Sequence, residues 1–529
     1  MHNTPYEVKD SAGKLAKGFI RNPLTALLGV FLLVMGYISL EVMPREENPQ
    51  MVISGSTVIV AMPGATAKEI EEVIVKPLER KLKEVKGVEH IYGTAMDNVG
   101  VVNVAFFIGE EKDGSNLKVY DKIMQNSDMF PKTAMNPIIK PLDIDVDIPI
   151  VTVAFYANDK SLDKTDVYDY AKQVQHHING LDNVAVTALK GGHQHQYNVD
   201  VDLHKLSGYN LSLGQITQAI QSIAYNVPAV KNRTKENRIV MFGVENAIED
   251  KRDIENIIVA QYMGAAIYLK DIATVADSFD KQNFKSAYVT ERGDDGKFSP
   301  MTDQVTLTIS KLQGTNAVII ADAVKEELEK YRDEMHKKGI NFVISRNDGE
   351  RANEAVNELV FHLVLSIVII AILLTLVLGW RESLIVTFTV PAILAITLFV
   401  AYLTGQTINR ITLFAFLLSL GLLVDAAIIV IENIHRHYHD ADAADRDPDE
   451  LMIEATDEIG PPTNIATLAI ILTMVPMAFV GGMMGQFMKP IPANVPVALI
   501  ASLFVAYIFT PYLAVRLLKK PVKHDKGAK

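Results

Sequence analysis

Residues Gly421 to Asn433 read Gly-Leu-Leu-Val-Asp-Ala-Ala-Ile-Ile-Val-Ile-Glu-Asn. They belong to an apolar run over 411–434, and Asp425 is the ionisable residue at its middle. A carboxylate at the centre of a bilayer costs about 3 kcal/mol on insertion scales, and acids inside membrane segments commonly mark ion pathways. The run therefore predicts a membrane-spanning helix with Asp425 as its functional residue. Two other interpretations are a structural hydrogen-bonding role for Asp425 and a buried helix of a soluble protein, and the similar apolar runs nearby disfavour the second.

The amino-acid composition argues against several functional classes. The chain has 529 residues, of which 49% are hydrophobic, and a mean hydropathy of +0.16, which suits membrane spans combined with a large polar region. The formal net charge of −12 argues against a nucleic-acid partner. The absence of cysteine excludes disulfides and thiolate metal sites. The sequence has no P-loop, no dinucleotide-binding fingerprint and no motif that combines a catalytic nucleophile with a general base. We therefore expect a protein that is not an enzyme and needs no cofactor.

A basic segment precedes the first apolar run. Residues 1–23 carry Lys9, Lys14, Lys17 and Arg21, and the run itself covers 24–43. Basic residues before a first span favour a cytoplasmic N-terminal segment. A secretory signal peptide is the alternative, but Ser39 to Met43 lacks a small-x-small cleavage site. We therefore predict an uncleaved first transmembrane helix over 24–43.

The region from 44 to 350 contains no stretch long and apolar enough to cross a membrane. Its hydrophobic pattern instead repeats the order strand, helix, strand, as in the helix expected over 317–337 between strands at 304–309 and 340–345. We predict a large α/β domain on the side opposite the N-terminus. Its expected parts are a first subdomain over 44–136, a second formed by 137–193 and 281–350, and an inserted subdomain over 194–280.

Apolar runs return after residue 350. The predicted spans lie at 354–379, 384–404, 411–434, 463–481 and 494–518, with a polar cytoplasmic loop over 435–462 between the fourth and fifth spans of the complete set. The tail 519–529 contains Lys519, Lys520 and Lys523, which favours a cytoplasmic C-terminal segment. The predicted fold class is an α-helical membrane protein with six transmembrane helices and a large α/β domain between the first two.

This layout and several motifs resemble the N-terminal half of a resistance–nodulation–division (RND) efflux transporter. The stretch Gly421 to Asn433 resembles the fourth span of that family, and Ala61 to Thr66 resembles the start of its porter domain. Tyr197 to Asp202 resembles the beginning of its docking domain, and Thr510 to Leu513 the end of its sixth span. The resemblance implies periplasmic porter subdomains, a docking-like insertion over 194–280, and an inner-membrane proton antiporter in which Asp425 is the proton relay.

The fourth span departs from the pattern of drug-exporting members. Those members usually have paired aspartates, whereas Asp425 is followed here by Ala426 and Ala427. Asp-Ala-Ala with Glu432 and Asn433 resembles the heavy-metal efflux branch. The substrate class, whether drug, metal or lipid, stays open.

The resemblance also implies a missing partner. Family members normally carry two such halves, and a lysine in the tenth span faces the aspartate of the fourth. No lysine lies inside the spans predicted here. We therefore expect a half-size subunit that pairs with a second-half subunit supplying a transmembrane Lys or Arg, with three such pairs forming a trimer. A periplasmic adaptor and an outer-membrane channel are further expected partners; a natural half and a truncated protein are both compatible with the sequence.

Histidine and methionine clusters raise the possibility of metal binding. His435 and His439 are spaced to share a helical face, and His193 and His195 alternate in a strand-like stretch. Solvated or loop positions are the alternative, and packing is the alternative for the methionines around the fifth span. We predict no metal site at any of them; the methionines are Met474, Met477, Met483, Met484 and Met488.

Two other functional classes fit parts of the pattern. A protein-translocation accessory resembling SecD would also have six spans and an aspartate in the fourth. Its motif resembles Val-Asp-Ala-Asn followed by Phe-Glu-Arg, whereas this chain has Val424-Asp425-Ala426-Ala427 and Ile431-Glu432-Asn433. A membrane scaffold that does not transport is the third class. The Pro63-Gly64 stretch favours the exporter over the SecD-like accessory.

Overall fold

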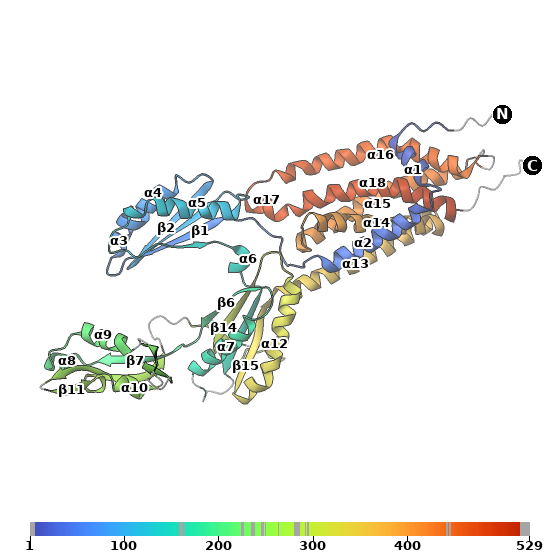
Figure 1. Cartoon of the computed structure of the whole chain (residues 1–529). Coiled ribbons are helices and arrows are strands. Elements are labelled where there is room, and N and C mark those ends of the chain that lie inside the picture. The colour runs from blue at the N-terminus through green and yellow to red at the C-terminus, as the bar shows by residue number, and fades with distance from the viewer. Residues whose placement is uncertain are drawn as a thin grey trace, which may run out of the picture.

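The computed structural model separates the chain into a helical bundle and an extramembrane α/β region (Figure 1). It describes residues 6–157, 162, 164–223, 227–233, 238–244, 248, 250–262, 264–279, 286–290, 292–293, 296–440, 443 and 446–518. Within these residues, six helices are long and apolar enough to cross a membrane. They are α2 (Leu24–Val42), α13 (Asp348–Val377), α14 (Trp380–Leu403), α15 (Arg410–Tyr438), α16 (Pro448–Ala478) and α18 (Pro490–Leu517), the last preceded by the short α17 (Gly482–Met488).

The core of the bundle lies around α15 and α18, which pack closely along their length. Small residues permit close approach elsewhere in the bundle, because a Cβ at Gly36 of α2 would come within 2.4 Å of the Ala395 Cβ in α14. The outer side of α13 is largely apolar and exposed, with Leu376 80% exposed. Such a surface is stable in a bilayer because lipid tails are as apolar as the side chains.

Two helices differ from the ranges predicted from sequence. The second span was expected to begin at 354, but α13 begins at Asp348, directly after β15, because Asn347 caps it by accepting from the Glu350 N–H. The range 435–462 was expected to be a polar loop with a surface helix near 448–459. The helix α16 begins at Pro448, as expected there, but it continues without a break through Pro461 and Pro462 to Ala478 and so includes the fifth span. The Thr463 hydroxyl donates to the Ile459 carbonyl one turn earlier in the same helix.

The first extramembrane unit is a four-stranded antiparallel sheet in the order β2-β3-β1-β4. Its strands are β1 (Gly55–Ala61), β2 (Val88–Met96), β3 (Val99–Phe106) and β4 (Ile138–Pro141). Helices α3 (Ala67–Ile70) and α4 (Lys76–Leu82), joined by a π-helical turn, cover one face together with α5 (Lys112–Gln125). Alternate residues of β1 and β3, such as Val58 and Val102, are fully buried against these helices.

The second extramembrane unit is an antiparallel sheet built from two separate parts of the chain. β5 (Val151–Ala157) and β6 (Val184–Gly191) flank α7 (Lys164–Ile178), while β14 (Thr302–Lys311) and β15 (Ile340–Asn347) flank α12 (Ala317–Lys337). β14 pairs with both β5 and β6, and β15 pairs with β5. The short β13 (Tyr288–Val289) extends the edge of β14. The two halves therefore share one core, which includes Phe155, Leu307 and Leu328.

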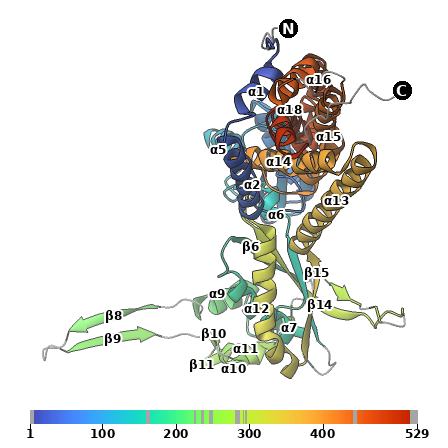
Figure 2. The same ribbon diagram turned by 90° about the vertical axis from the view of Figure 1, so that its right-hand side faces the viewer.

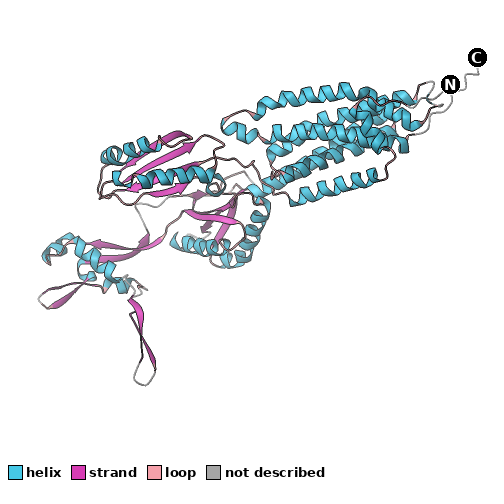
Figure 3. Cartoon of the chain, turned by 45° about the horizontal axis from the view of Figure 1, so that its top comes forward, coloured by secondary structure: helices cyan, strands magenta, loops and turns pink. Residues whose placement is uncertain are grey.

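An insertion between β6 and β14 forms a third small core of its own. β7 (His195–Val201) pairs with β12 (Ala273–Phe279), and α8 (Leu203–Gly208) and α9 (Leu213–Ile223) lie beside them. The remaining elements of this part are β10 (Ile258–Tyr262), β11 (Ala265–Tyr268), α10 (Lys251–Glu255) and α11 (Leu269–Ile272). β8 (Val227–Arg233) and β9 (Ile239–Val244) form a separate two-stranded arm that extends away from the rest (Figures 2 and 3).

A short helix, α1 (Ser11–Phe19), closes the end of the bundle far from the extramembrane region. The Asp457 carboxylate of α16 fixes its start by accepting from the Tyr6 hydroxyl at 2.8 Å and from the N–H groups of Lys9 and Asp10 at 2.9 and 2.8 Å. Burial, together with the hydrogen bond to Asp457, raises the pKa of Tyr6 to about 12. At the same end, the Arg516 guanidinium of α18 donates to the Ile20 carbonyl, so the first and last helices meet there.

Candidate functional site

Asp425 lies near the middle of α15, about 20 Å from either end of the helix. One face of α15 is buried by α14, α16 and α18, and it includes Leu423, Ala427 and Val430. Asp425 lies on the opposite face, which the bundle leaves uncovered from end to end. We call this the open face of α15; its residues are spaced three or four apart and are Phe414, Leu418, Gly421, Asp425, Ile429 and Glu432.

Within the described residues, the Asp425 carboxylate has no ion-pair or hydrogen-bond partner. The arginines nearest in the sequence are engaged elsewhere: the Arg436 guanidinium binds Glu458, and the Arg410 guanidinium binds Glu47. An ionised carboxylate without a partner in a bilayer is strongly disfavoured. The open face therefore needs either a proton on Asp425 or a cation from a group outside this bundle.

The small residues near Asp425 have different environments. Ser419 is fully buried, and its hydroxyl donates to the Phe416 carbonyl of the same helix. Gly421 lies on the open face, and a Cβ there would meet nothing within 4 Å. The spacing of Gly421 and Asp425 therefore leaves room for another helix to approach the carboxylate closely.

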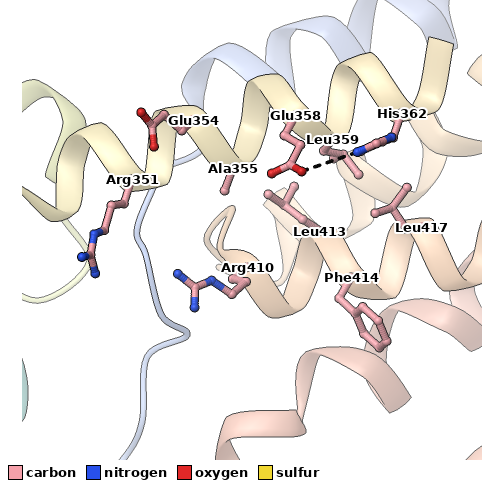
Figure 4. Close-up of a pocket in the computed structure, with 10 residues that line it drawn as sticks. All are labelled: Arg351, Glu354, Ala355, Glu358, Leu359, His362, Arg410, Leu413, Phe414 and Leu417. Carbon is pink, nitrogen blue, oxygen red and sulfur yellow. Dashed lines mark ion pairs between the residues drawn. The ribbon is translucent and has the colours of Figure 1, made fainter. Parts of the chain in front are cut away.

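A groove with a volume of about 590 Å³ separates α13 from α15 at the end of the bundle nearest the extramembrane region (Figure 4). α13 contributes Glu354, Glu358 and His362 to its walls, and the His362 Nε2 lies 3.5 Å from the Glu358 Oε1. α15 contributes Arg410 and Phe414 among others. Phe414 also belongs to the open face, and along α15 the lining of the groove ends at Leu417, eight residues before Asp425.

A buried ion pair connects the bundle to the second extramembrane sheet. The Lys311 Nζ at the end of β14 lies 3.0 Å from the Glu46 Oε1, in the segment that follows α2, and the two side chains are only 6% and 5% exposed. The Gln50 amide also donates to the Glu46 carboxylate at 3.0 Å. The Glu46 N–H in turn donates to the Ile408 carbonyl, just before α15 begins. We call these four residues the joint.

The neighbouring residues strengthen the same connection. The Glu47 carboxylate accepts from Arg410 of α15 at 2.8 Å and lies 3.5 Å from Arg351 of α13. The Ala317 N–H, at the start of α12, donates to the Arg45 carbonyl. Where β15 passes into α13, the Arg346 guanidinium donates hydrogen bonds to the Asp348 carboxylate, which raise the pKa of Arg346. The contacts of Glu46 and Glu47 and the passage from β15 into α13 therefore connect both helices to the same end of the second sheet.

The histidines singled out in the sequence occupy separate places. His435 Nδ1 lies 3.2 Å from the Glu382 Oε1, and the His435 and His439 rings are stacked with their centroids 4.2 Å apart. His195 Nε2 lies 2.5 Å from the Asp277 Oδ1, whereas His193 is buried with its ring against Phe279. Within the described residues, no group of three or more His, Asp or Glu side chains could hold a metal ion.

The methionines do not form one group either. Met477 and Met488 pack against the bundle core, while Met483 and Met484 of α17 are 58% and 63% exposed. Packing against the bundle core therefore explains the positions of Met477 and Met488.

The arrangement defines a multi-pass membrane protein with a large α/β region between its first two spans. Residues 15–528 match the model of the family described as AcrB/AcrD/AcrF. The chain belongs to this family of RND transporters, which are multi-pass proteins of the inner membrane. The match confirms the RND resemblance seen in the motifs; the heavy-metal branch and the half-size subunit stay predictions.

The joint was not found from the sequence. Glu46 and Lys311 are 265 positions apart, and each looks like an ordinary surface charge beside polar neighbours. The only local signal is the Arg45-Glu46-Glu47 run directly after the first span.

The joint predicts a particular pattern of stabilities. Replacing Lys311 with Met removes the cation that neutralises the buried Glu46 carboxylate, so we expect the free energy of unfolding to fall by about 3 kcal/mol. Combining it with Glu46→Leu removes both charges and is expected to restore most of that loss. The measurement is the thermal unfolding of the purified chain in nanodiscs.

A matched control is Lys330→Met, because the Lys330 Nζ also lies 3.0 Å from a carboxylate, that of Glu327, but its side chain is 58% exposed. A change of only about 0.5 kcal/mol is expected there. The interpretation of the joint is wrong if Lys311→Met destabilises the chain no more than Lys330→Met does.

Proposed function

We propose that these residues form the N-terminal half of a proton-motive-force-driven exporter, and that Asp425 is its proton relay. The observation that carries the proposal is the position of Asp425 at mid-helix on the open face of α15, next to Gly421. A carboxylate in a low-dielectric site exchanges its proton according to the presence of a nearby cation. Such a group can follow a proton gradient when a partner helix presents that cation.

The partner in this proposal is a second helical bundle of similar size with Lys or Arg near its middle. With Asp425 ionised, the two charges attract and hold the helices together; protonation removes the attraction and lets α15 shift. Three such pairs form the complete exporter, which works with a periplasmic adaptor and an outer-membrane channel. These assembly features rest on family membership and on the uncovered face.

The joint supplies a route from Asp425 to the extramembrane sheets in this mechanism. α15 begins beside Ile408, whose carbonyl is bound by Glu46, and Glu46 binds Lys311 of β14. A shift of α15 would therefore move the second sheet relative to the first. In the proposal, the extramembrane units are periplasmic porter subdomains that take up the substrate and release it outward as they move.

We expect Asp425→Asn to reduce proton-driven export to background while the amount of protein in the membrane stays near normal. The amide keeps the size of the side chain but cannot titrate, and Asp425→Glu should keep part of the activity. Export is measured in cells with a fluorescent substrate under an imposed proton gradient. Glu432→Gln, on the same face but near the helix end, is the matched control and should export normally; normal export by Asp425→Asn would make the carboxylate structural.

The proposed orientation places α1 and the end of α18 in the cytoplasm, and the extramembrane region in the periplasm. It is supported by Lys14 and Lys17 on the exposed side of α1. Because the chain contains no cysteine, single cysteines can report the side of the membrane. An impermeant maleimide added to spheroplasts should modify Ser207→Cys and leave Ser11→Cys unmodified. The reverse pattern would overturn the orientation.

A further inference from the structure

The turn between α13 and α14 lies at the end of the bundle far from the extramembrane region. α13 ends at Val377 and α14 begins at Trp380, so two residues, Leu378 and Gly379, make the whole turn. Gly379 has a φ of +121°, which residues with a side chain rarely adopt, and this permits the short connection. The turn therefore places Trp380 and Arg381 directly beside the end of α13.

The surface on both sides of this turn is apolar and exposed. It consists of Leu376 and Val377 of α13 and Leu384 of α14, and we call these three residues the apolar patch. Trp380, the single tryptophan of the chain, is 64% exposed and lies four residues before Leu384 in the same helix. Exposed apolar residues of a spanning helix face lipid chains, and tryptophan favours the level of the lipid headgroups. The edge of the bilayer is therefore expected at Trp380.

The Arg381 guanidinium is held in place but lacks a counter-charge. Its Nη1 donates to the Leu517 carbonyl at 2.7 Å, and its Cζ lies 5.1 Å from the centroid of the Trp380 ring. Its Nε and Nη2 groups make no hydrogen bond or ion pair with any residue that the structure describes. The neighbouring Glu382 carboxylate lies instead 3.2 Å from the His435 Nδ1. Arg381 therefore has N–H groups available for an anion from outside the chain.

Capping of α18 is the simpler role for Arg381, because the last carbonyls of a helix lack partners within it. Arg516, at the same end of α18, shows such a structural role. Its guanidinium donates to the Ile20 and Tyr512 carbonyls and stacks on the Tyr512 ring, which is buried. Arg381 differs because its aromatic partner and the apolar patch beside it are exposed.

We propose that Arg381 and Trp380 bind an anionic phospholipid from the leaflet at this end of the bundle. The phosphate lies on the free N–H groups of Arg381, and the acyl chains lie along the apolar patch. Guanidinium groups match the geometry of phosphate oxygens, and a basic residue at a membrane surface attracts lipids of net negative charge. A zwitterionic lipid carries the same phosphate, but its own cation compensates the charge. The site is independent of the proposed function; only the cytoplasmic side of this leaflet follows from the proposed orientation.

The single tryptophan allows binding at the site to be measured directly. The full chain is placed in phosphatidylcholine nanodiscs, and part of the lipid is replaced by phosphatidylglycerol or phosphatidylcholine that carries bromine near the headgroup end of its acyl chains. Bromine quenches the fluorescence of an adjacent tryptophan. We expect phosphatidylglycerol to occupy the site about fivefold more strongly than phosphatidylcholine, the preference expected for one basic residue at a membrane surface. Arg381→Gln should abolish this preference, and Arg381→Lys, which keeps the charge, should retain most of it.

Arg332→Gln is the matched control, because the Arg332 guanidinium also stacks on an aromatic ring, that of Phe342, but belongs to the extramembrane α12. It should keep the fivefold preference, and so should Asp425→Asn, which lies at the middle of α15. An excess of soluble glycerol phosphate should leave the quenching unchanged. Relief of the quenching by this compound would identify free phosphate as the occupant and contradict the proposal.

The comparison of the two lipids in the unmodified chain does not depend on how well any variant folds. Equal quenching by phosphatidylglycerol and phosphatidylcholine would overturn the proposal and leave capping of α18 as the role of Arg381. A preference that Arg381→Gln leaves unchanged would overturn it as well. Export by Asp425→Asn bears on the proton relay alone, so failure of the relay and failure of the lipid site are distinguishable.

Discussion

The position of one carboxylate constrains how this bundle can work. Asp425 lies at the middle of an apolar helix, and the helices that bury the other side of α15 leave its own side uncovered. An ionised carboxylate at that position is stable only with a cation beside it. Without a cation, the neutral, protonated form is favoured. The absence of a Cβ at Gly421 leaves space for a second helix at that point. The charge state of Asp425 and the packing of the open face therefore depend on each other.

The extramembrane sheets are tied to that helix by buried and partly buried charges. The Glu46 carboxylate forms an ion pair with Lys311 of the second sheet, and the Glu46 N–H donates to the Ile408 carbonyl just before α15. The neighbouring Glu47 carboxylate forms an ion pair with Arg410 of α15. A buried ion pair adds little net stability compared with an apolar pair, but it is costly to break and fixes a particular contact. This suits a connection that must keep its geometry while the parts on either side move.

Sequence patterns located the elements more reliably than the contacts between them. The helix expected over 317–337 is α12, because its apolar residues recur every three or four positions. The start of α16 lies in the range predicted as a polar segment, and the helix continues through Pro461 and Pro462 because neighbouring helices can stabilise proline within a span. Asp425 could be placed at mid-span from its run, but which side of α15 stays uncovered depends on the packing of α14, α16 and α18. The joint brings together residues far apart in the chain, and the charged run Arg45-Glu46-Glu47 is the only local pattern that points to it.

The central claim is that a cation-bearing helix packs on the open face of α15. Site-specific photo-cross-linking in native membranes tests it most directly, with a photoreactive amino acid at Leu418, one turn from Gly421, and identification of the linked peptides by mass spectrometry. The account predicts cross-links to a membrane-spanning helix that carries Lys or Arg near its middle, and their loss in the Asp425→Asn background. Cross-links to lipid alone would show that the open face borders the bilayer, and would contradict the account.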